Sequence, residues 1–187
     1  MSGTEAAEAP WVRDVLAFWF DELGEAHWFS KSDAIDAQIR RRFGTLHDRV
    51  VSHGGIDVAT ARPLLAAVIV LDQFSRNMFR GTPRAFAADP IGRRLARQAI
   101  DRGFDLSMTP AERLFLYLPF EHSEDREDQA LAVHLIGQLG DEGWTRYALA
   151  HQSIIDRFGR FPHRNAILGR TSTPEELALL EDPMGSF

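Results

Sequence analysis

The chain has 187 residues, a length that fits one domain with its own core better than two independently folded domains. Hydrophobic residues make up 44% and charged residues 26%, a globular composition that excludes a wholly disordered chain. The net charge of −6 disfavours general binding to nucleic acid or to an anionic membrane, and the lack of cysteine excludes disulfides, thiolate metal sites and a cysteine nucleophile.

The start of the sequence shows no targeting signal. The stretch MSGTEAAEAP is acidic and lacks the basic start and apolar core of a secretory signal. The longest aliphatic run, residues 64–71, is far shorter than the ~20 residues of a membrane-spanning helix. We therefore expect a cytoplasmic protein with a disordered tail over residues 1–9 and a single domain over residues 10–187.

Helix start and stop signals recur along the chain. A capping box with proline at the first helical position begins at Thr109 and again at Thr173, where the threonine and the glutamate three residues later can satisfy unpaired amide protons. Asp89 followed by proline repeats the cap without the box. Glycine after an apolar-periodic stretch is typical of a helix end, and this pattern occurs at Gly24, Gly103, Gly140 and Gly159.

These signals predict an all-α fold. No stretch alternates apolar and polar residues in the manner of a strand. Helices joined by short turns usually pack antiparallel on their neighbours, so we expect a compact stack of antiparallel helical hairpins. The predicted helices cover residues 10–23, 32–53, 61–79, 90–102, 110–118, 124–139, 141–158 and 174–181.

The third predicted helix changes abruptly from apolar to polar. Residues 64–71 are apolar on every side and should be buried. Asp72 and Arg76, which follow, are four residues apart and therefore neighbours on a helix, while Asn77 and Arg80 belong to a second polar stripe. Two interpretations are open: a helix end that meets solvent with an ordinary ion pair, or polar groups that leave the core toward a site.

The fifth predicted helix shows the same change. Residues 114–120 are apolar, and Glu121 and His122 follow directly. We expect Pro119 to break or kink the helix, because proline removes a backbone donor and clashes with the previous turn, so that the pair would lie at a bend. Ser123, followed by two acidic residues, is typical of a helix cap. Capping accounts for these acids and leaves His122 unexplained.

A third segment, residues 154–165, passes from two isoleucines into an irregular turn with glycine and proline. It contains three arginines, a histidine and two phenylalanines, which suit a solvated loop, an RNA-contacting patch or an anion-binding wall. The acidic chain has no second basic patch, and this disfavours nucleic acid. His151, on the apolar face of the preceding helix, is interpreted as a hydrogen-bonded core histidine.

The common signatures of metal and enzyme sites are absent from the sequence. No two histidines have the i,i+4 spacing of a helical zinc site, and no Glu-x-x-His pattern of a di-iron site occurs. There is neither a glycine-rich phosphate loop nor a nucleophile elbow. We therefore expect no cofactor and no metal, while a metal site assembled from distant segments stays open.

Several long stretches are irregular and specific: VLAFWFDE (15–22), LDQFSRNMFRG (71–81), FLYLPFEHSED (115–125), RFGRFPHRNAILGR (157–170) and STPEE (172–176). In these stretches the chain resembles the uncharacterised bacterial family catalogued as domain of unknown function 924, and the resemblance spans nearly the whole chain. Strings such as FGRFPHRN are too irregular to recur by chance. The resemblance implies an all-helical fold similar to tetratricopeptide-like hairpin stacks, and it implies no activity.

The three apolar-to-polar segments together suggest one site, because each ends a stretch too apolar to be exposed. Arginine forks bind carboxylate or phosphate, and a histidine beside a carboxylate can act as a general acid or base. Four guanidiniums would repel a metal cation, so we expect a pocket for a small anionic molecule, and the sequence leaves open whether the protein is an enzyme. The candidate catalytic residues are His122, Glu121 and Asp72, and the candidate ligand-binding residues are Arg76, Arg80, Arg160, His163, Arg164 and Asn165.

A second function is equally compatible with the sequence. Stacked helical hairpins commonly present a concave groove to a peptide or partner protein, and the polar segments would then only lock turns together. A closed pocket with convergent arginine and histidine favours the first function, and an open groove favours the second. Neither a nucleic-acid nor a membrane partner is expected, and the oligomeric state is left open.

Overall fold

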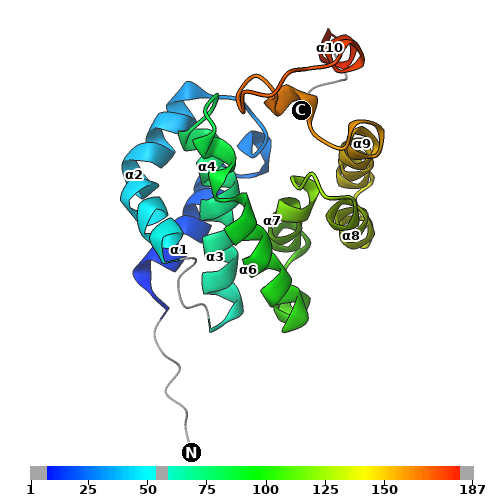
Figure 1. The fold of residues 1–187 in the computed structure, drawn as a ribbon. Helices are drawn as coiled ribbons and strands as arrows, with labels where there is room; N and C mark the ends of the chain where they lie inside the picture. Colours follow the sequence, from blue (N-terminus) through cyan, green and yellow to red (C-terminus); the bar gives the residue numbers. More distant parts are fainter. Residues whose placement is uncertain (1–7, 54–58, 182–187) are drawn as a thin grey trace, which may run out of the picture.

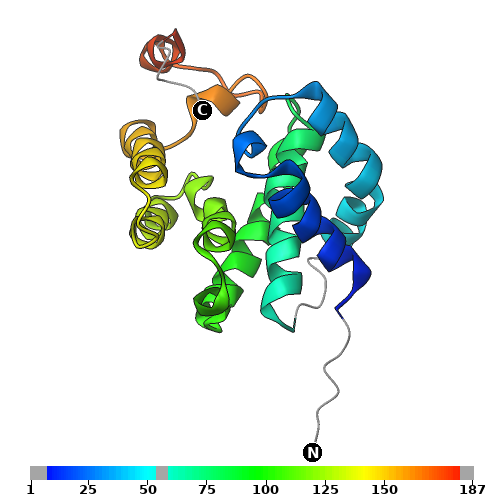
Figure 2. The same ribbon diagram turned by 180° about the vertical axis from the view of Figure 1, so that it is seen from behind.

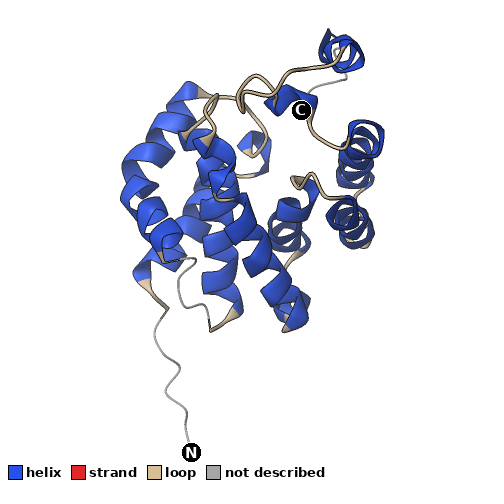
Figure 3. Ribbon diagram, in the orientation of Figure 1, coloured by secondary structure: helices blue, strands red, loops and turns tan. Residues whose placement is uncertain are grey.

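The computed structural model describes residues 8–53 and 59–181, and these ranges contain helices and loops but no strand (Figure 3). The all-α prediction is therefore confirmed for this part of the chain. Most of the tail predicted over residues 1–9 lies outside the described residues, as do the last six residues of the predicted domain. No described helix combines the length and the apolar character needed to cross a membrane.

All the helices predicted from sequence are present, with ends within three residues of the expected ones. Two are continuous rods that the structure divides into α-helical and wider π-helical segments. The elements are α1 (Pro10–Leu16), η1 (Ala17–Leu23), η2 (Glu25–His27), α2 (Asp33–Ser52), α3 (Ala61–Ile69), η3 (Val70–Phe74), α4 (Ser75–Met78), α5 (Arg84–Ala87), α6 (Asp89–Asp101), η4 (Phe104–Ser107), α7 (Pro110–Glu121), α8 (Arg126–Gly137), α9 (Glu142–Phe158), η5 (Pro162–Arg164) and α10 (Pro174–Glu181).

Helix α3 and its π-helical continuation η3 lie at the centre of the molecule, as both opposite views show (Figures 1 and 2). Helices α1, α6 and α7 pack on α3, and α2 packs on η3 and α4. Beyond α7, helix α8 packs on α7 and α9 packs on α8, so this pair lies at the opposite end from α2. The fold is thus a stack of neighbouring helices, and its tetratricopeptide-like character stays a prediction.

Aromatic side chains fix η3 within the core. Phe74, fully buried, lies 5.7 Å from Trp19 and 4.8 Å from Phe43, measured between ring centroids. Trp19 in turn contacts Phe115 of α7 edge-on at 5.3 Å. Because one cluster joins η1, η3, α2 and α7, the polar residues that flank Phe74 are held in place by core packing.

A smaller apolar cluster lies apart from this core. It consists of Ile154, Ile155 and Phe161, with Phe158 and Leu179 packed against it. It joins the end of α9 to η5 and α10, and we refer to it as the C-terminal cluster.

The capping boxes are confirmed. Thr109 Oγ1 accepts a hydrogen bond from the Glu112 amide at 3.3 Å, and Glu112 accepts from the Thr109 amide at 2.9 Å. The same exchange joins Thr173 and Glu176. The glycines predicted as helix stops all have positive φ, which favours a residue without a Cβ: Gly24, Gly103, Gly140 and Gly159.

Two predictions about the end of α7 and the start of α8 are wrong. Pro119 does not break α7, which continues to Glu121 with His122 as its C-cap. Proline loses one amide hydrogen bond here, and burial of every residue from 114 to 121 against its neighbours outweighs that loss. Ser123 does not cap the next helix either, since Asp125 accepts the bonds from the first amides of α8. The serine hydroxyl instead donates to Asp128 at 2.8 Å.

We predict that Phe74→Ala lowers the free energy of unfolding by about 3–5 kcal/mol, because it leaves a cavity among buried rings. Urea unfolding of the full chain measures the change. Phe29→Ala is the matched control: its ring is 63% exposed, and its loss should cost less than about 1 kcal/mol. Equal costs for the two variants would contradict the central position of Phe74.

Candidate functional site

Asp72, in η3, lies at the centre of a group of buried ionisable side chains. Its side chain is 1% exposed, and its carboxylate oxygens lie 2.9 and 3.0 Å from Nδ1 of His122 at the end of α7. Gln73 donates to the same carboxylate at 2.6 Å, and Arg76 Nη1 lies 2.9 Å from Oδ1. Burial alone would raise the pKa of Asp72, but the charge of Arg76 and the close contact with His122 outweigh burial and hold that pKa well below its usual value.

Asp89 connects a second arginine to this group. Arg76 donates to both of its oxygens, at 2.9 and 3.0 Å, in the fork geometry that suits a carboxylate. Nη1 of Arg164, from η5, lies 3.8 Å from Asp89 Oδ2. The aspartate therefore lies between two guanidiniums, one from α4 and one from the C-terminal segment.

Arg164 is buried between aromatic rings and incompletely hydrogen-bonded. Its guanidinium lies 4.6 Å from the ring centroids of both Phe86 and Phe161, and Nη2 donates to the His122 carbonyl at 2.9 Å. Its buried Nε has no hydrogen-bond acceptor within residues 8–53 and 59–181. Burial, with a further contribution from the charge of Arg76, lowers the pKa of Arg164 to about 10. Arginine with such an unsatisfied donor is suited to an additional acceptor.

Glu121 is a buried carboxyl that forms no ion pair with an arginine within the described residues. Its Oε1 lies 3.2 Å from Nδ1 of His151, in the middle of α9. That same Nδ1 lies 2.9 Å from the Tyr147 carbonyl. Burial, and then the negative charge of Asp72, raise the pKa of Glu121 to about 8. Burial lowers the pKa of His151 to about 3, so this ring is neutral at pH 7.

His163 lies at the edge of this group. Its ring centroid is 5.5 Å from that of Phe161, and burial together with the charge of Arg164 lowers its pKa to about 4. No hydrogen bond joins it to the central carboxylates in the described part of the chain. Together, the residues Asp72, Arg76, Asp89, Glu121, His122, His151 and Arg164 are called the buried polar cluster below.

Three candidate residues are bound elsewhere. Arg80 donates to Asp36 of α2 at 2.8 Å, and Asn77 joins the same carboxylate. Arg160 donates to Glu176 of α10 at 2.6 and 2.8 Å. The third, Asn165, also donates to Glu176, at 3.2 Å. Of the four arginines expected around one site, two lie in the buried polar cluster and two hold other elements together.

Two members of the buried polar cluster were not predicted from sequence. Asp89 matched the pattern of a helix cap, but Ala88 is the N-cap of α6 and Asp89 points to Arg76 from the first turn. His151 was interpreted as a core histidine, and its burial and its bond to Tyr147 agree with that interpretation. Only the position of Glu121, from another helix, distinguishes it from an ordinary core residue.

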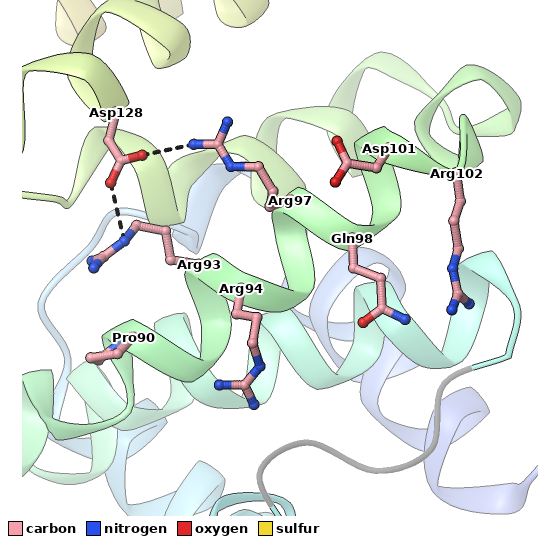
Figure 4. A pocket seen from close by; sticks show the side chains of 8 residues that line it. All are labelled: Pro90, Arg93, Arg94, Arg97, Gln98, Asp101, Arg102 and Asp128. Carbon is pink, nitrogen blue, oxygen red and sulfur yellow. Dashed lines mark hydrogen bonds and ion pairs between the residues drawn. The ribbon is translucent and has the colours of Figure 1, made fainter.

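A hollow of about 540 Å³ opens over α6, away from the candidate residues (Figure 4). Arg93 and Arg97 both reach Asp128 of α8, at 3.1 and 2.9 Å, so these arginines connect two helices. Arg102 points away from Asp128 in this view. The lining residues are Pro90, Arg93, Arg94, Arg97, Gln98, Asp101, Arg102 and Asp128.

The fold and the buried polar cluster define an all-helical protein with an ionisable centre between its helices. The sequence pattern of the family described as "Bacterial protein of unknown function (DUF924)" matches residues 15–184, and the chain therefore belongs to that family. The family resemblance expected from the sequence is thus confirmed.

A solved structure of a protein of unknown function from Agrobacterium tumefaciens is similar to this one. The two sequences are 41% identical, and the superposition has a TM-score of 0.85. The match covers 91% of this chain and 96% of the other. No curated protein matches the chain significantly.

We predict that Asp72→Ala lowers the free energy of unfolding by about 3 kcal/mol, at the lower end of the range for breaking a buried ion pair because Arg76 keeps Asp89. Denaturant unfolding at pH 7 measures it. Asp14→Ala removes an exposed partner of Arg13 and should change stability by less than about 0.5 kcal/mol. A similarly small loss for Asp72→Ala would place that carboxylate outside the stabilising network.

A second prediction concerns acid unfolding. The hydrogen bond from Arg160, opposed by burial and aided by the Thr173 amide, lowers the pKa of Glu176 from 4.5 to about 2. A carboxyl with a lowered pKa stabilises the fold above pH ~4.5 and loses that contribution as the pH falls toward 2. Glu176→Gln should therefore be less stable than the wild type at pH 7, with a difference that shrinks over this interval.

Thermal unfolding between pH 7 and pH 2 tests this. Glu175→Gln, at the exposed neighbouring position, is the control and should follow the wild-type curve. A pH-independent difference for Glu176→Gln would show that the ionised carboxylate is not what holds α10 to Arg160.

Proposed function

We propose that the buried polar cluster binds a small anionic molecule, a carboxylate or a phosphate, and that the protein is an enzyme acting on it. The observation that carries this proposal is the incomplete hydrogen bonding of the buried Arg164 guanidinium. Its guanidinium is nearly fully buried, and only one of its nitrogens makes a hydrogen bond of normal length within the described residues.

The donors of Arg164 support binding of an anion. A buried charge is costly unless it is paired and hydrogen-bonded. Arg76 already fills both oxygens of Asp89, so Arg164 obtains only a 3.8 Å approach to that carboxylate. A ligand oxygen at the guanidinium would supply a close acceptor, and planar carboxylate and phosphate groups suit its fork geometry.

His122 supports chemistry at the same place. Asp72 holds the proton on Nδ1 and so leaves the lone pair on Nε2, the arrangement in which a histidine can accept a proton or bind a metal. The side chain remains 16% exposed, so solvent reaches part of it. Because Arg164 donates to the carbonyl of the same residue, an anion at Arg164 lies close to a reactive group.

The alternative function, a groove for a protein or peptide, has less support. Apart from Tyr147 and Leu149, which share α9, the large exposed apolar side chains come from different parts of the described chain, and single exposed apolar residues are normal on a protein surface. These residues are Phe29, Leu106, Tyr147, Leu149, Leu168 and Leu177.

Phosphate, sulfate or a small carboxylate should raise the melting temperature of the protein. At 100 times the dissociation constant the expected gain is roughly 5–10 °C for a chain of this size. Arg164→Lys should lose most of the gain, because lysine cannot reproduce the planar fork. Arg160→Lys is the matched control from the same segment and should keep it, since Arg160 is bound to Glu176.

Sodium chloride at equal ionic strength separates binding from screening. An equal gain with chloride, or an equal gain in Arg164→Lys and the wild type, would contradict anion binding at Arg164.

A further inference from the structure

Within the buried polar cluster, three side chains have the composition of a metal site. Glu121 and His122 come from the end of α7, and His151 comes from the middle of α9. One potential ligand atom from each residue lies within 4.8 Å of those of the other two. Two imidazoles and one carboxylate are a ligand set found in catalytic zinc sites, where a further position stays open.

The hydrogen bonds of both histidines favour this use. Asp72 accepts from Nδ1 of His122, and the Tyr147 carbonyl accepts from Nδ1 of His151 at 2.9 Å. In metal sites the ligating histidine almost always donates its other ring N–H to a carboxylate or a backbone carbonyl. In both rings this leaves the lone pair on Nε2, a form in which imidazole binds a metal, and Nδ1 of His151 also lies 3.2 Å from Oε1 of Glu121.

The charges around the three side chains also allow a cation. The sequence led us to expect four arginines here, but Arg80 and Arg160 pair with carboxylates elsewhere. The two that remain, Arg76 and Arg164, face the two aspartates of the buried polar cluster. Glu121 is then the remaining carboxyl, and a divalent cation would balance it.

We propose that Glu121, His122 and His151 together bind one divalent transition-metal ion of the zinc type, with at least one coordination position left for water or for the anion. Only the identity of that last ligand rests on the proposed function. Mixed nitrogen and oxygen ligands favour zinc and its neighbours over magnesium or calcium, which prefer oxygen alone.

The separation of the two histidine rings is close to that of a coordinated pair. The ring centroids of His122 and His151 are 6.2 Å apart. Two imidazoles on a tetrahedral zinc ion, with Zn–N bonds of ~2.1 Å, place their centroids roughly 5 Å apart. An approach of the two rings on the order of 1 Å would therefore bring their centroids to the separation of a coordinated pair.

The test is a calorimetric titration of the chelator-treated full chain with Zn²⁺ in a buffer free of phosphate and carboxylate. One ion should bind per chain. His151→Gln should weaken binding by more than about 100-fold, beyond the effect expected for loss of an outer hydrogen-bond partner. His163→Gln, a nearby buried histidine outside the three ligands, is the matched control and should bind as the wild type does.

Asp72→Asn tests the positioning of His122. It should keep the stoichiometry of one ion and weaken the affinity by roughly 10–100-fold. Equal zinc affinity in His151→Gln, His163→Gln and the wild type would overturn the proposal, because it would assign the binding to other histidines. So would a wild-type chain that binds no zinc.

If His151→Gln does not fold, Co²⁺ added to the wild type provides a second measurement. Strong visible absorption, typical of four- or five-coordinate cobalt, supports the site, and the weak absorption of a six-coordinate ion overturns it. Arg164→Lys separates this inference from the proposed function, because it should lose the response to anions and keep zinc. Anion stabilisation without zinc binding would overturn the metal site alone, whereas zinc binding without any response to anions would leave it supported.

Discussion

The buried carboxylate of Asp72 is the interaction on which the arrangement of the buried polar cluster depends. It accepts hydrogen bonds from Gln73 and from His122, the C-cap of α7, and forms an ion pair with Arg76, which extends the contact to α6 through Asp89. Removing a carboxylate from water is costly, and only close partners compensate for that cost. Every partner of Asp72 must therefore be held in position. The aromatic core around Phe74, two residues after Asp72 in the sequence, holds them there.

Asp72 lies in a π-helical segment, and this affects the directions in which the neighbouring side chains project. A π turn contains more residues than an α turn and frequently occurs at functional sites. In this chain η3 lies between two α-helical segments, so the side chains before and after it project in directions that one regular helix would not give. Arg76 turns toward Asp89, and Arg80 turns toward Asp36 of α2.

Much of this could be predicted from the sequence, because local rules govern it. Capping boxes and glycine stops depend on a few adjacent residues, and the helices follow from them. The abrupt polar endings at Asp72 and Glu121 indicated a site because a fully apolar helix has to be buried. The rest depends on tertiary placement. Arg76 and Arg80 have equivalent local patterns, and only the neighbouring helices decide which of them joins the buried polar cluster.

The dependence on tertiary placement also explains why the structural settings of His151 and Pro119 could not be predicted from the sequence. A histidine on an apolar helical face has one pattern whether it fills space or meets a carboxyl from another helix, and Glu121 decides the matter here. At Pro119 the local rule predicted a break, but burial of the whole last turn of α7 outweighs the lost hydrogen bond. Predicting such outcomes requires the energies of long-range contacts, and these cannot be read from a single sequence.

The separation of the C-terminal cluster from the main core has a consequence for the kinetics of ligand exchange. Arg164 and Phe161 belong to a segment whose own apolar core is small and which is otherwise held by polar contacts, such as those between Arg170 and Glu124. A unit of this kind opens with a lower free energy than the whole domain. Entry and exit of the proposed anion at the buried polar cluster would therefore follow local opening of this segment, while α3 and its aromatic core stay folded.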